Sequence, residues 1–573
     1  MLWCLVWAVL ASGHLRGSSR ELFSITRFPT VDAFAHHDDY YYYYAEPETP
    51  SGPSDTSAPA IPSPAPVFTR FPTPSANEPN TPPPKPLIRP NIVLALADDL
   101  GFGDVGFTNR KMNVAKTPNL DLIASLDSTW VLNNFHSEAA CSPSRMAILT
   151  ARSPIRNCVL GSPVNSKTVY NPTAQTVVHL ANQLHYRTLF LGKFLPRGNS
   201  MPIPATDRPG QLGFQNWTSI EGGSTYDFAC VCRDHVGNTS NCFLGHETPS
   251  TFAEYEKLCL AQSSPFGQDD FPPRYSMEAD FLASKFHTWL EREVLPTEPF
   301  LVQISFRSVH VPFVASPELR KACLENEICN PTAKPKTSLE LDYAGCVYSI
   351  DQAVGRIRDS LKQLRPLDFD NTLFVFMSDN GPAPPQTGGG NAGGMLGNKN
   401  SLMFEGLLRV PALINWPRAI TENAQVESFL SIMDIPATVA HAISGSPLPD
   451  TDGMSILPHI QQANTEFSRP AHFGVCGFTD SGEVKKGLAC PALVMYDPTG
   501  RWKLIAERVS ANRMGHAPAS QVKTSTLRMY DLTETNLEAK TTTQGPRGEL
   551  IRQANLYLSS VFASFRQNCV GYY

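Results

Sequence analysis

The chain has 573 residues, of which 42% are apolar and 17% charged, and its formal net charge is −6. This length is more than one ordinary hydrophobic core supports, so we expect two folded domains and an irregular segment. The acidic balance gives no electrostatic reason to expect nucleic acid as a partner, although a local basic pocket is compatible with binding small anions.

The first residues predict export. The short apolar run Leu2–Leu10 ends near Ala11-Ser12-Gly13, which is typical of a signal peptide over residues 1–13. The run is too short to span a membrane, and no later run reaches that length without charge, so we expect no stable membrane insertion. The mature protein is therefore expected in the secretory pathway, either extracellular or lysosomal.

Residues 14–89 predict a disordered linker. They contain His36-His37-Asp38-Asp39, the five tyrosines Tyr40–Tyr44 and then a stretch dense in Pro, Ser and Thr. Such a composition buries too little apolar surface to offset the entropy lost on ordering.

The chain has 13 cysteines, one of them within the signal peptide. In an exported protein without paired CxxC motifs, disulfides are favoured over zinc for the clustered ones. These clusters are Cys230, Cys232, Cys242 and Cys259, and then Cys323 and Cys329. Asn216 and Asn238 each begin a glycosylation sequon.

Four continuous apolar runs predict buried strands within a first domain over residues 90–440. Continuous rather than alternating hydrophobicity indicates a parallel sheet that is covered on both faces. Amphipathic stretches at residues 174–184, 279–290 and 341–364 lie between the runs and predict helices, which makes the domain α/β. The runs are Ile92–Ala97, Thr188–Leu191, Phe300–Phe306 and Leu373–Met377.

Polar side chains follow these runs, and in an α/β sheet the strand ends meet at one edge. Three carboxylates and an amide are hard oxygen ligands, which indicate Ca²⁺, or less favourably Mg²⁺, rather than zinc. Carboxylates gathered without a cation would repel one another, so a metal ion or a lysine must lie among them. The polar residues that follow the four apolar runs are Asp98, Asp99, Lys193, His310, Asp379 and Asn380.

Cys141 precedes Ser142-Pro143, which is typical of the start of a helix. A thiol at a positive helix end, with Arg145 one turn further on, is expected to have a lowered pKa. On residue types alone, a buried or disulfide-bonded cysteine explains the pattern equally well. The strand-end carboxylates favour a cysteine in the active site.

Residues 441–573 predict a smaller second domain. Short strand patterns occur at Arg501–Ile505 and Met529–Leu532, and an amphipathic helix is expected at about 550–565. This part of the chain specifies no chemistry by itself.

The segments Cys141–Arg145 and Leu149–Arg152 resemble the CxPSR and Leu-Thr-Gly-Arg signature of the type I, formylglycine-dependent sulfatases. Other segments resemble further motifs of that family and follow one another in the same order along the chain. Leu149–Asn157 is most similar to the family's arylsulfatase A and N-acetylgalactosamine-6-sulfatase branch. The further segments are Asn91–Gly101, Tyr186–Lys193, His310–Pro312, Asp342–Leu361, Ser378–Gly381, Arg409–Pro411 and Asp452–Pro458.

The resemblance implies an alkaline-phosphatase-like sandwich with a large, mostly parallel sheet flanked by helices, followed by a small domain with an antiparallel sheet. It implies hydrolysis of a small-molecule or carbohydrate sulfate monoester. Cys141 would be oxidised to formylglycine by the formylglycine-generating enzyme, and its hydrate would attack sulfur. The implied Ca²⁺ ligands are Asp98, Asp99, Asp379 and Asn380, and the implied catalytic residues are Cys141, Arg145, Lys193, His310 and Lys399.

The chain departs from the family pattern at four places. Leu195 replaces an active-site histidine, Ala151 replaces a glycine, Glu405-Gly406-Leu407 replaces Glu-Gly-Gly, and Lys399 is displaced by one residue from the usual lysine. Two rival functions follow. One is a phosphomonoester or phosphonate hydrolase of the same fold, and the other is a catalytically weak, sulfatase-like binding protein.

Overall fold

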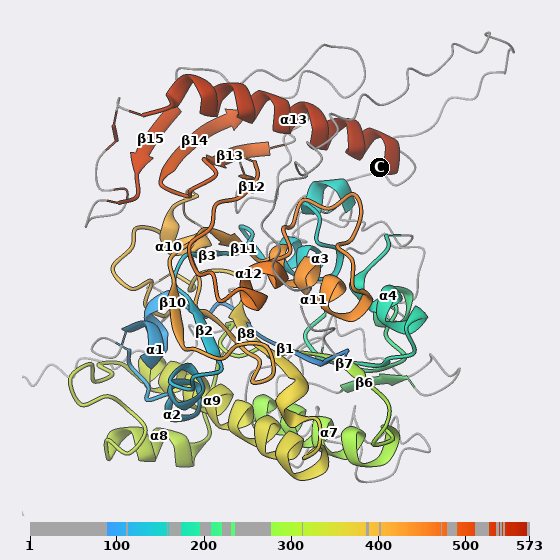
Figure 1. The fold of residues 1–573 in the computed structure, drawn as a ribbon. Coiled ribbons are helices and arrows are strands. Elements are labelled where there is room, and N and C mark those ends of the chain that lie inside the picture. The colour runs from blue at the N-terminus through green and yellow to red at the C-terminus, as the bar shows by residue number, and fades with distance from the viewer. Residues whose placement is uncertain are drawn as a thin grey trace, which may run out of the picture. The chain divides into compact units, whose positions relative to one another are not determined.

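The computed structural model (Figure 1) describes residues 89–109, 113–157, 159, 174–194, 208–220, 231–234, 277–311, 313–384, 389–399, 401, 403–471, 473–477, 490–509, 527–533, 538, 541–542 and 545–569. The expected signal peptide, nearly all of the expected linker, Leu195 and the sequon at Asn238 lie outside these residues. Asn216 lies inside them, where its Nδ2 donates a hydrogen bond of 3.1 Å to Glu293. Glycosylation and export stay predictions.

A mixed sheet forms the centre of the described part of the chain, where it has nine strands. Seven strands run parallel, and only β9 and β6 are reversed. Their order is β10 (Ala424–Val426), β2 (Thr129–Leu132), β9 (Ala412–Asn415), β8 (Thr372–Ser378), β1 (Asn91–Ala97), β7 (Phe300–Ser305), β4 (Arg187–Gly192), β5 (Asn216–Ile220) and β6 (Val231–Asp234).

The four predicted strands are the adjacent strands β8, β1, β7 and β4. Every residue of β1, β7 and β8 is buried, as their unbroken hydrophobicity predicted. Leu96 of β1 is paired with Met377 on one side and Ser305 on the other, so the strands end nearly level. Their carboxyl ends therefore lie at one edge of the sheet.

Two apolar cores cover the two faces of the sheet, because successive side chains of β1 point in opposite directions. Ile92, Leu94 and Leu96 pack into one core with helices α3 (Cys141–Thr150), α4 (Val177–Gln183) and α11 (Asp434–Ser444). Val93, Ala95 and Ala97 pack into the other with α2 (Pro118–Ala124), α7 (Glu278–Glu293), α8 (Pro317–Leu324) and α9 (Ser338–Leu364). Figure 1 shows the two helix layers on either side of the sheet. The expected sandwich is confirmed.

The three helices expected in this part form close to their predicted bounds. Helix α9 starts three residues before the predicted Leu341, because Thr337 and Glu340 form a capping box at its amino end. Shorter elements complete this part of the chain. They are α1 (Gly106–Asn109), α5 (Arg208–Gln211), α10 (Glu405–Leu408), α12 (Leu457–Gln461), β3 (Phe135–His136), β11 (Leu430–Ser431), and the 3₁₀ turns at Phe102–Asp104, Pro154–Asn157 and Phe369–Asn371.

A four-stranded antiparallel sheet follows, as predicted for the end of the chain. Its order is β12 (Phe473–Gly477), β13 (Cys490–Tyr496), β14 (Trp502–Val509) and β15 (Leu527–Asp531). Helix α13 (Arg547–Cys569) packs against it through Leu550, Ala554 and Leu558. None of the described helices has both the length and the apolar character that crossing a bilayer requires.

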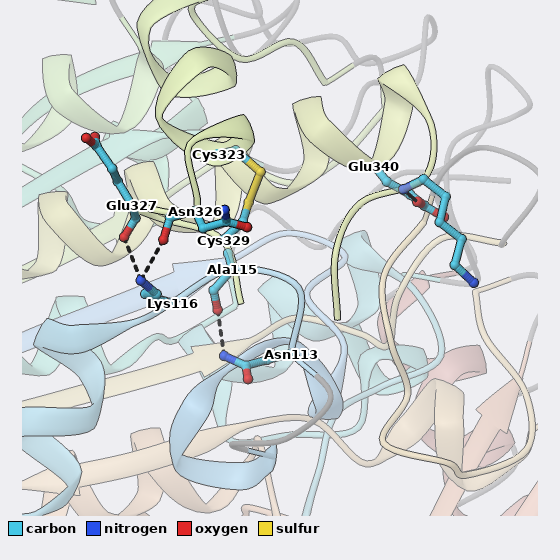
Figure 2. Close-up of a disulfide and its surroundings, with 9 residues drawn as sticks. Asn113, Ala115, Lys116, Cys323, Asn326, Glu327, Cys329 and Glu340 are labelled. Atoms are coloured by element: carbon cyan, nitrogen blue, oxygen red, sulfur yellow. Dashed lines mark hydrogen bonds between the residues drawn. A yellow bond between two sulfur atoms is a disulfide. The ribbon is translucent and has the colours of Figure 1, made fainter. Parts of the chain in front are cut away.

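One of the predicted cysteine clusters forms a disulfide in the described residues, between Cys323 and Cys329. Figure 2 shows Lys116 beside the loop that this disulfide closes. Its Nζ donates hydrogen bonds of 2.9 Å to the carbonyls of Asn326 and Glu327 in that loop. Cys141 and Cys346 are buried thiols. The disulfide closes the loop at the end of α8, and the hydrogen bonds of Lys116 join that loop to the segment that leads into α2.

Replacing both Cys323 and Cys329 with Ser should lower the free energy of unfolding by about 2 kcal/mol, because a short loop is no longer closed in the unfolded chain. The shift in thermal midpoint measures this loss. Reducing agent should remove most of the difference in midpoint between the wild type and the double variant, because it opens the same loop in the wild type. An equal midpoint for both proteins without reductant would contradict the expectation.

Candidate functional site

The structure brings together all nine residues that the sequence singled out. Asp98 and Asp99 follow β1, Asp379 and Asn380 follow β8, and Lys193 follows β4. The strand β7 leads to His310, α3 supplies Cys141 and Arg145, and a loop before α10 supplies Lys399. Hydrogen bonds and ion pairs join these residues into one cluster at the carboxyl edge of the sheet.

Cys141 is at the centre of this cluster and is only 2% exposed. Its Sγ lies 3.2 Å from Asp98 Oδ1 and 3.4 Å from Asn380 Oδ1. Lys399 Nζ lies 3.2 Å from the same sulfur, and Lys193 Nζ lies 3.7 Å from it. An atom carried by residue 141 is therefore within reach of acidic, amide and cationic groups at once.

The expected lowering of the thiol pKa is wrong. Burial, followed by the charges of Asp379 and Asp98, raises the pKa of Cys141 far above its usual value. The helix end and Arg145 do not reverse this rise in pKa, because Arg145 forms ion pairs with Asp379 and Asp98. Cys141 is thus a neutral thiol, and as a thiol it is a weak nucleophile at neutral pH.

Arg145 ties the start of α3 to two strand ends. Its Nη2 lies 2.8 Å from Asp379 Oδ2 and 3.5 Å from Asp98 Oδ2, and its Nη1 donates a hydrogen bond of 2.6 Å to the carbonyl of Lys193. Ser144, which comes from the same motif, donates a hydrogen bond to the carbonyl of Asp379. The motif therefore fixes α3 against the ends of β8 and β4.

Two lysines pair with the acidic residues after β1. Lys193 forms an ion pair with Asp98, and Lys399 Nζ lies 2.7 Å from Asp99 Oδ1. Burial alone would raise the pKa of Asp98, but Lys193, His310 and Arg145 hold it well below its usual value. Asp99 raises the pKa of Lys399 despite burial. The displaced Lys399 thus occupies the site.

The charges of the cluster balance without leaving a surplus. Asp98, Asp99 and Asp379 contribute three negative charges, and Arg145, Lys193 and Lys399 contribute three positive charges. Even so, burial and the charge of Asp98 raise the pKa of Asp379 to about 7. These three cations do not fully stabilise the ionised form of every carboxylate, so a further cation would be accommodated there.

The ligand atoms suit a divalent ion. One atom each from Asp98, Asp99, Cys141 and His310 lies within 4.8 Å of the others. Asn380 belongs to the same cluster, since its Nδ2 lies 2.7 Å from Asp99 Oδ1. Asp379 accepts a hydrogen bond of 3.2 Å from the Asp99 amide while facing Arg145. A sulfur and an imidazole thus lie beside the four oxygen ligands that the sequence predicted.

His310 has a defined tautomer. Its Nδ1 lies 2.5 Å from the carbonyl of Val311, which only accepts, so the proton is on Nδ1. The Nε2 lone pair lies 3.9 Å from Asp99 Oδ2. Burial, Lys193 and Lys399 lower the pKa of His310 to about 4, so the imidazole is neutral at physiological pH.

The sequence did not point to Arg307, two residues after β7. Its Nη1 is buried and has no hydrogen-bond partner among the described residues. The charges of Asp98 and Glu278 both favour its protonated form, although burial lowers its pKa. An arginine shortly after a strand is usually exposed to solvent, so no local sequence pattern could show that the Arg307 side chain is buried near Asp98.

The structure explains one departure from the family pattern. Ala151 ends α3 with φ 55°, in the left-handed region that favours glycine. Its carbonyl accepts hydrogen bonds of 2.9 and 3.0 Å from the amides of Asp452 and Gly453. Alanine in this conformation costs about 1 kcal/mol, so the motif keeps its geometry at a modest cost.

Comparison with known proteins identifies the family. Residues 90–446 match the family model described as Sulfatase, so the chain belongs to the Sulfatase family of hydrolases. It is 28% identical to arylsulfatase G of Rattus norvegicus over 404 residues, which cover 64% of this chain and 68% of the relative. It is also 28% identical to N-acetylgalactosamine-6-sulfatase of Homo sapiens over 391 residues, which cover 65% of this chain and 66% of the relative. The match thus spans about two thirds of each relative.

A solved structure supports the same fold. The carbohydrate complex of Ps i-CgsB with k-i-k-neocarrahexaose superimposes with a TM-score of 0.61 at 21% identity, and the alignment covers 84% of this chain and 94% of that one. The alkaline-phosphatase-like architecture expected from the sequence is confirmed.

Replacing Asp379 with Asn should lower the binding of a divalent ion strongly, because it removes a carboxylate whose ionised form the three cations do not fully stabilise. We expect a loss of at least about 100-fold in turnover of an ester substrate. Metal content is measured after dialysis against metal-free buffer.

The matched control is Asp351→Asn. Asp351 is also a buried carboxylate, but it accepts hydrogen bonds from Asn119 and Leu120 at the start of α2. This variant should be less stable and retain its metal. Equal metal content in the two variants would refute the assignment of Asp379.

Proposed function

We propose that this chain hydrolyses sulfate monoesters in a reaction centred on residue 141. The observation that carries the proposal is the position of Cys141, buried in a sulfatase motif and in contact with Asp98, Asn380 and Lys399. Membership of the Sulfatase family supports the choice of sulfate.

The raised thiol pKa supports modification of Cys141, because a neutral thiol would not attack sulfur readily. As a formylglycine hydrate, residue 141 would supply one hydroxyl for attack on sulfur and a second for the release of sulfate. The enzyme that makes this modification is therefore an expected biosynthetic partner. The ion would be held by Asp98, Asp99, Asp379 and Asn380. Without the sulfur, the remaining ligands are mainly oxygen, which favours Ca²⁺ over Mg²⁺ and zinc.

The cations of the site would bind the sulfate group. Lys193 and Lys399 both lie within 4 Å of Cys141 Sγ, so their amines flank any group bound at residue 141. Arg145 holds Asp379 and Asp98 and thereby positions the start of α3. A divalent ion would change the net charge of the three carboxylates and three cations from zero to +2, and a positive site attracts an anionic ester.

His310 would manage the proton of the leaving alcohol. Its Nδ1–H is held by Val311, and its Nε2 lone pair faces the site. A neutral imidazole in that tautomer could accept on Nε2 the proton that the attacking hydroxyl of residue 141 loses, and then pass it to the oxygen of the leaving alcohol. With Leu195 in place of the family's histidine, His310 still provides an imidazole, and a ring nitrogen of it lies within 4.8 Å of Cys141 Sγ.

We propose a carbohydrate sulfate ester, or a small aryl sulfate, as the substrate class. One relative bears the name N-acetylgalactosamine-6-sulfatase, and the solved structure contains a neocarrahexaose. We further propose that the protein acts extracellularly or in lysosomes, since the apolar run at its start and the Cys323–Cys329 disulfide are typical of exported proteins.

Mass spectrometry of the tryptic peptide containing residue 141 tests the nucleophile. Protein from its native host should carry formylglycine at this position in an appreciable fraction of molecules. Cys141→Ala should lower activity by at least about 1,000-fold, because the attacking group is removed. A fully active protein with unmodified Cys141 would exclude the mechanism.

A pair of chromogenic esters tests the choice between sulfate and phosphate. The aryl sulfate should be turned over at least about 100-fold more efficiently than the matched aryl phosphate. The reverse order would favour the phosphomonoester hydrolase. Hydrolysis of neither ester, with formylglycine absent, would favour a binding protein.

A further inference from the structure

A fully buried ionic network joins the C-terminal sheet to α10, the short helix that follows the Lys399 loop. Glu405, the first residue of α10, accepts hydrogen bonds of 2.8 Å from Lys503 of β14 and from Tyr496 of β13. Its second carboxylate oxygen lies 2.9 Å from Nε2 of His136 in β3. Lys503 also pairs with Glu538 at 2.6 Å. The side chains of Glu405, Lys503 and His136 are all 0% exposed.

The network is electrostatically demanding. Burial would raise the pKa of Glu405, yet Lys503 and His136 hold it well below its usual value. Glu405 and Glu538 in turn raise the pKa of Lys503 despite its burial. Removing Lys503 would leave two buried carboxylates without the cation that they share, which is strongly unfavourable. Lys503 therefore holds Glu405 in one place.

From Glu405, backbone hydrogen bonds lead to the reacting groups. The amide of Gly406 donates to the carbonyl of Leu396 at 2.7 Å, and the amide of Lys399 donates to the carbonyl of Pro382 at 2.8 Å. The amide of Gly381, next to Asn380, donates to the carbonyl of Leu407 at 2.7 Å. The start of α10 is thus bonded to the Lys399 loop and to the end of β8.

We propose that Lys503 is a positioning residue for the reaction: by fixing Glu405, it holds α10, and through α10 it places the Lys399 amine beside residue 141. The inference rests on the proposed role of Lys399 in binding the sulfate group. It gives the C-terminal sheet a part in catalysis, although no residue of that sheet touches Cys141 in the contacts described above. It also gives a role to the glutamate of the Glu405-Gly406-Leu407 segment, which departs from Glu-Gly-Gly at its third residue.

A double-mutant cycle tests whether Lys503 acts through Lys399. Lys503→Met should lower kcat/KM by about 10- to 100-fold, the scale of a small displacement of a catalytic group. In a Lys399→Ala background, the same substitution should change kcat/KM by less than about twofold, because the group it positions is absent. A loss of equal size in both backgrounds would show a purely structural role and overturn the proposal.

Two further variants make the comparison specific. Arg501→Gln removes an exposed ion pair with Asp531 next to the same strand and should leave kcat/KM unchanged. If Lys503→Met does not fold, Glu405→Gln keeps the shape of the side chain and removes its charge, and it should show the same dependence on Lys399. Its failure to do so would also overturn the proposal.

Hydrogen exchange separates this inference from the proposed function, because it needs no turnover. Lys503→Met should speed exchange at the amides of Lys399, Gly406 and Gly381, while amides within β1 keep their protection. If these amides lose protection in a protein that hydrolyses no sulfate ester, the proposed function fails and the anchoring holds. Unchanged exchange at all three amides would refute the anchoring itself.

Discussion

The rest of the site depends on the neutralisation of three buried carboxylates at the ends of β1 and β8. Asp98, Asp99 and Asp379 are almost fully buried, and isolated charges in such a place would be highly unstable. Each compensating cation comes from a different element: Arg145 from α3, Lys193 from the end of β4 and Lys399 from the loop before α10. This charge balance fixes the polar ends of these elements to one another and surrounds Cys141 with polar groups.

The same balance implies how the site selects its ligand. While the lysines neutralise the carboxylates, the cluster has no net charge with which to attract an anion. A divalent ion bound by the carboxylates would leave a surplus of positive charge beside residue 141, where an ester sulfate would be held. Metal binding and anion binding are therefore expected to be coupled, although each uses different side chains.

Much of the fold could be predicted because its signals are local. Each of the strands β1, β4, β7 and β8 is an apolar run with a polar residue soon after it, and parallel strands bring such residues to one edge. The thiol pKa of Cys141 could not be predicted, since it depends first on burial and then on the charges of Asp379 and Asp98, which lie far away in the sequence. The helix start and Arg145 suggested the opposite shift.

Other features were hidden for the same reason. Lys503 lies in an ordinary strand pattern, and only the folded structure shows that it meets Glu405 across 98 residues of sequence. Arg307 belongs to no recognised sequence motif, so its place beside the site could be seen only in the structure. Ala151 stands where the family has glycine, and only the folded structure shows that its backbone is left-handed, with φ 55°. Residues whose roles come from long-range charge or burial are those that sequence patterns miss.

The coupling between metal and anion can be measured directly by calorimetric titration of the protein with inorganic sulfate, in the presence of calcium and in the presence of a chelator. The account predicts that calcium strengthens sulfate binding by about 10-fold or more, and that sulfate strengthens calcium binding by the same factor. Equal sulfate affinity under both conditions would contradict it.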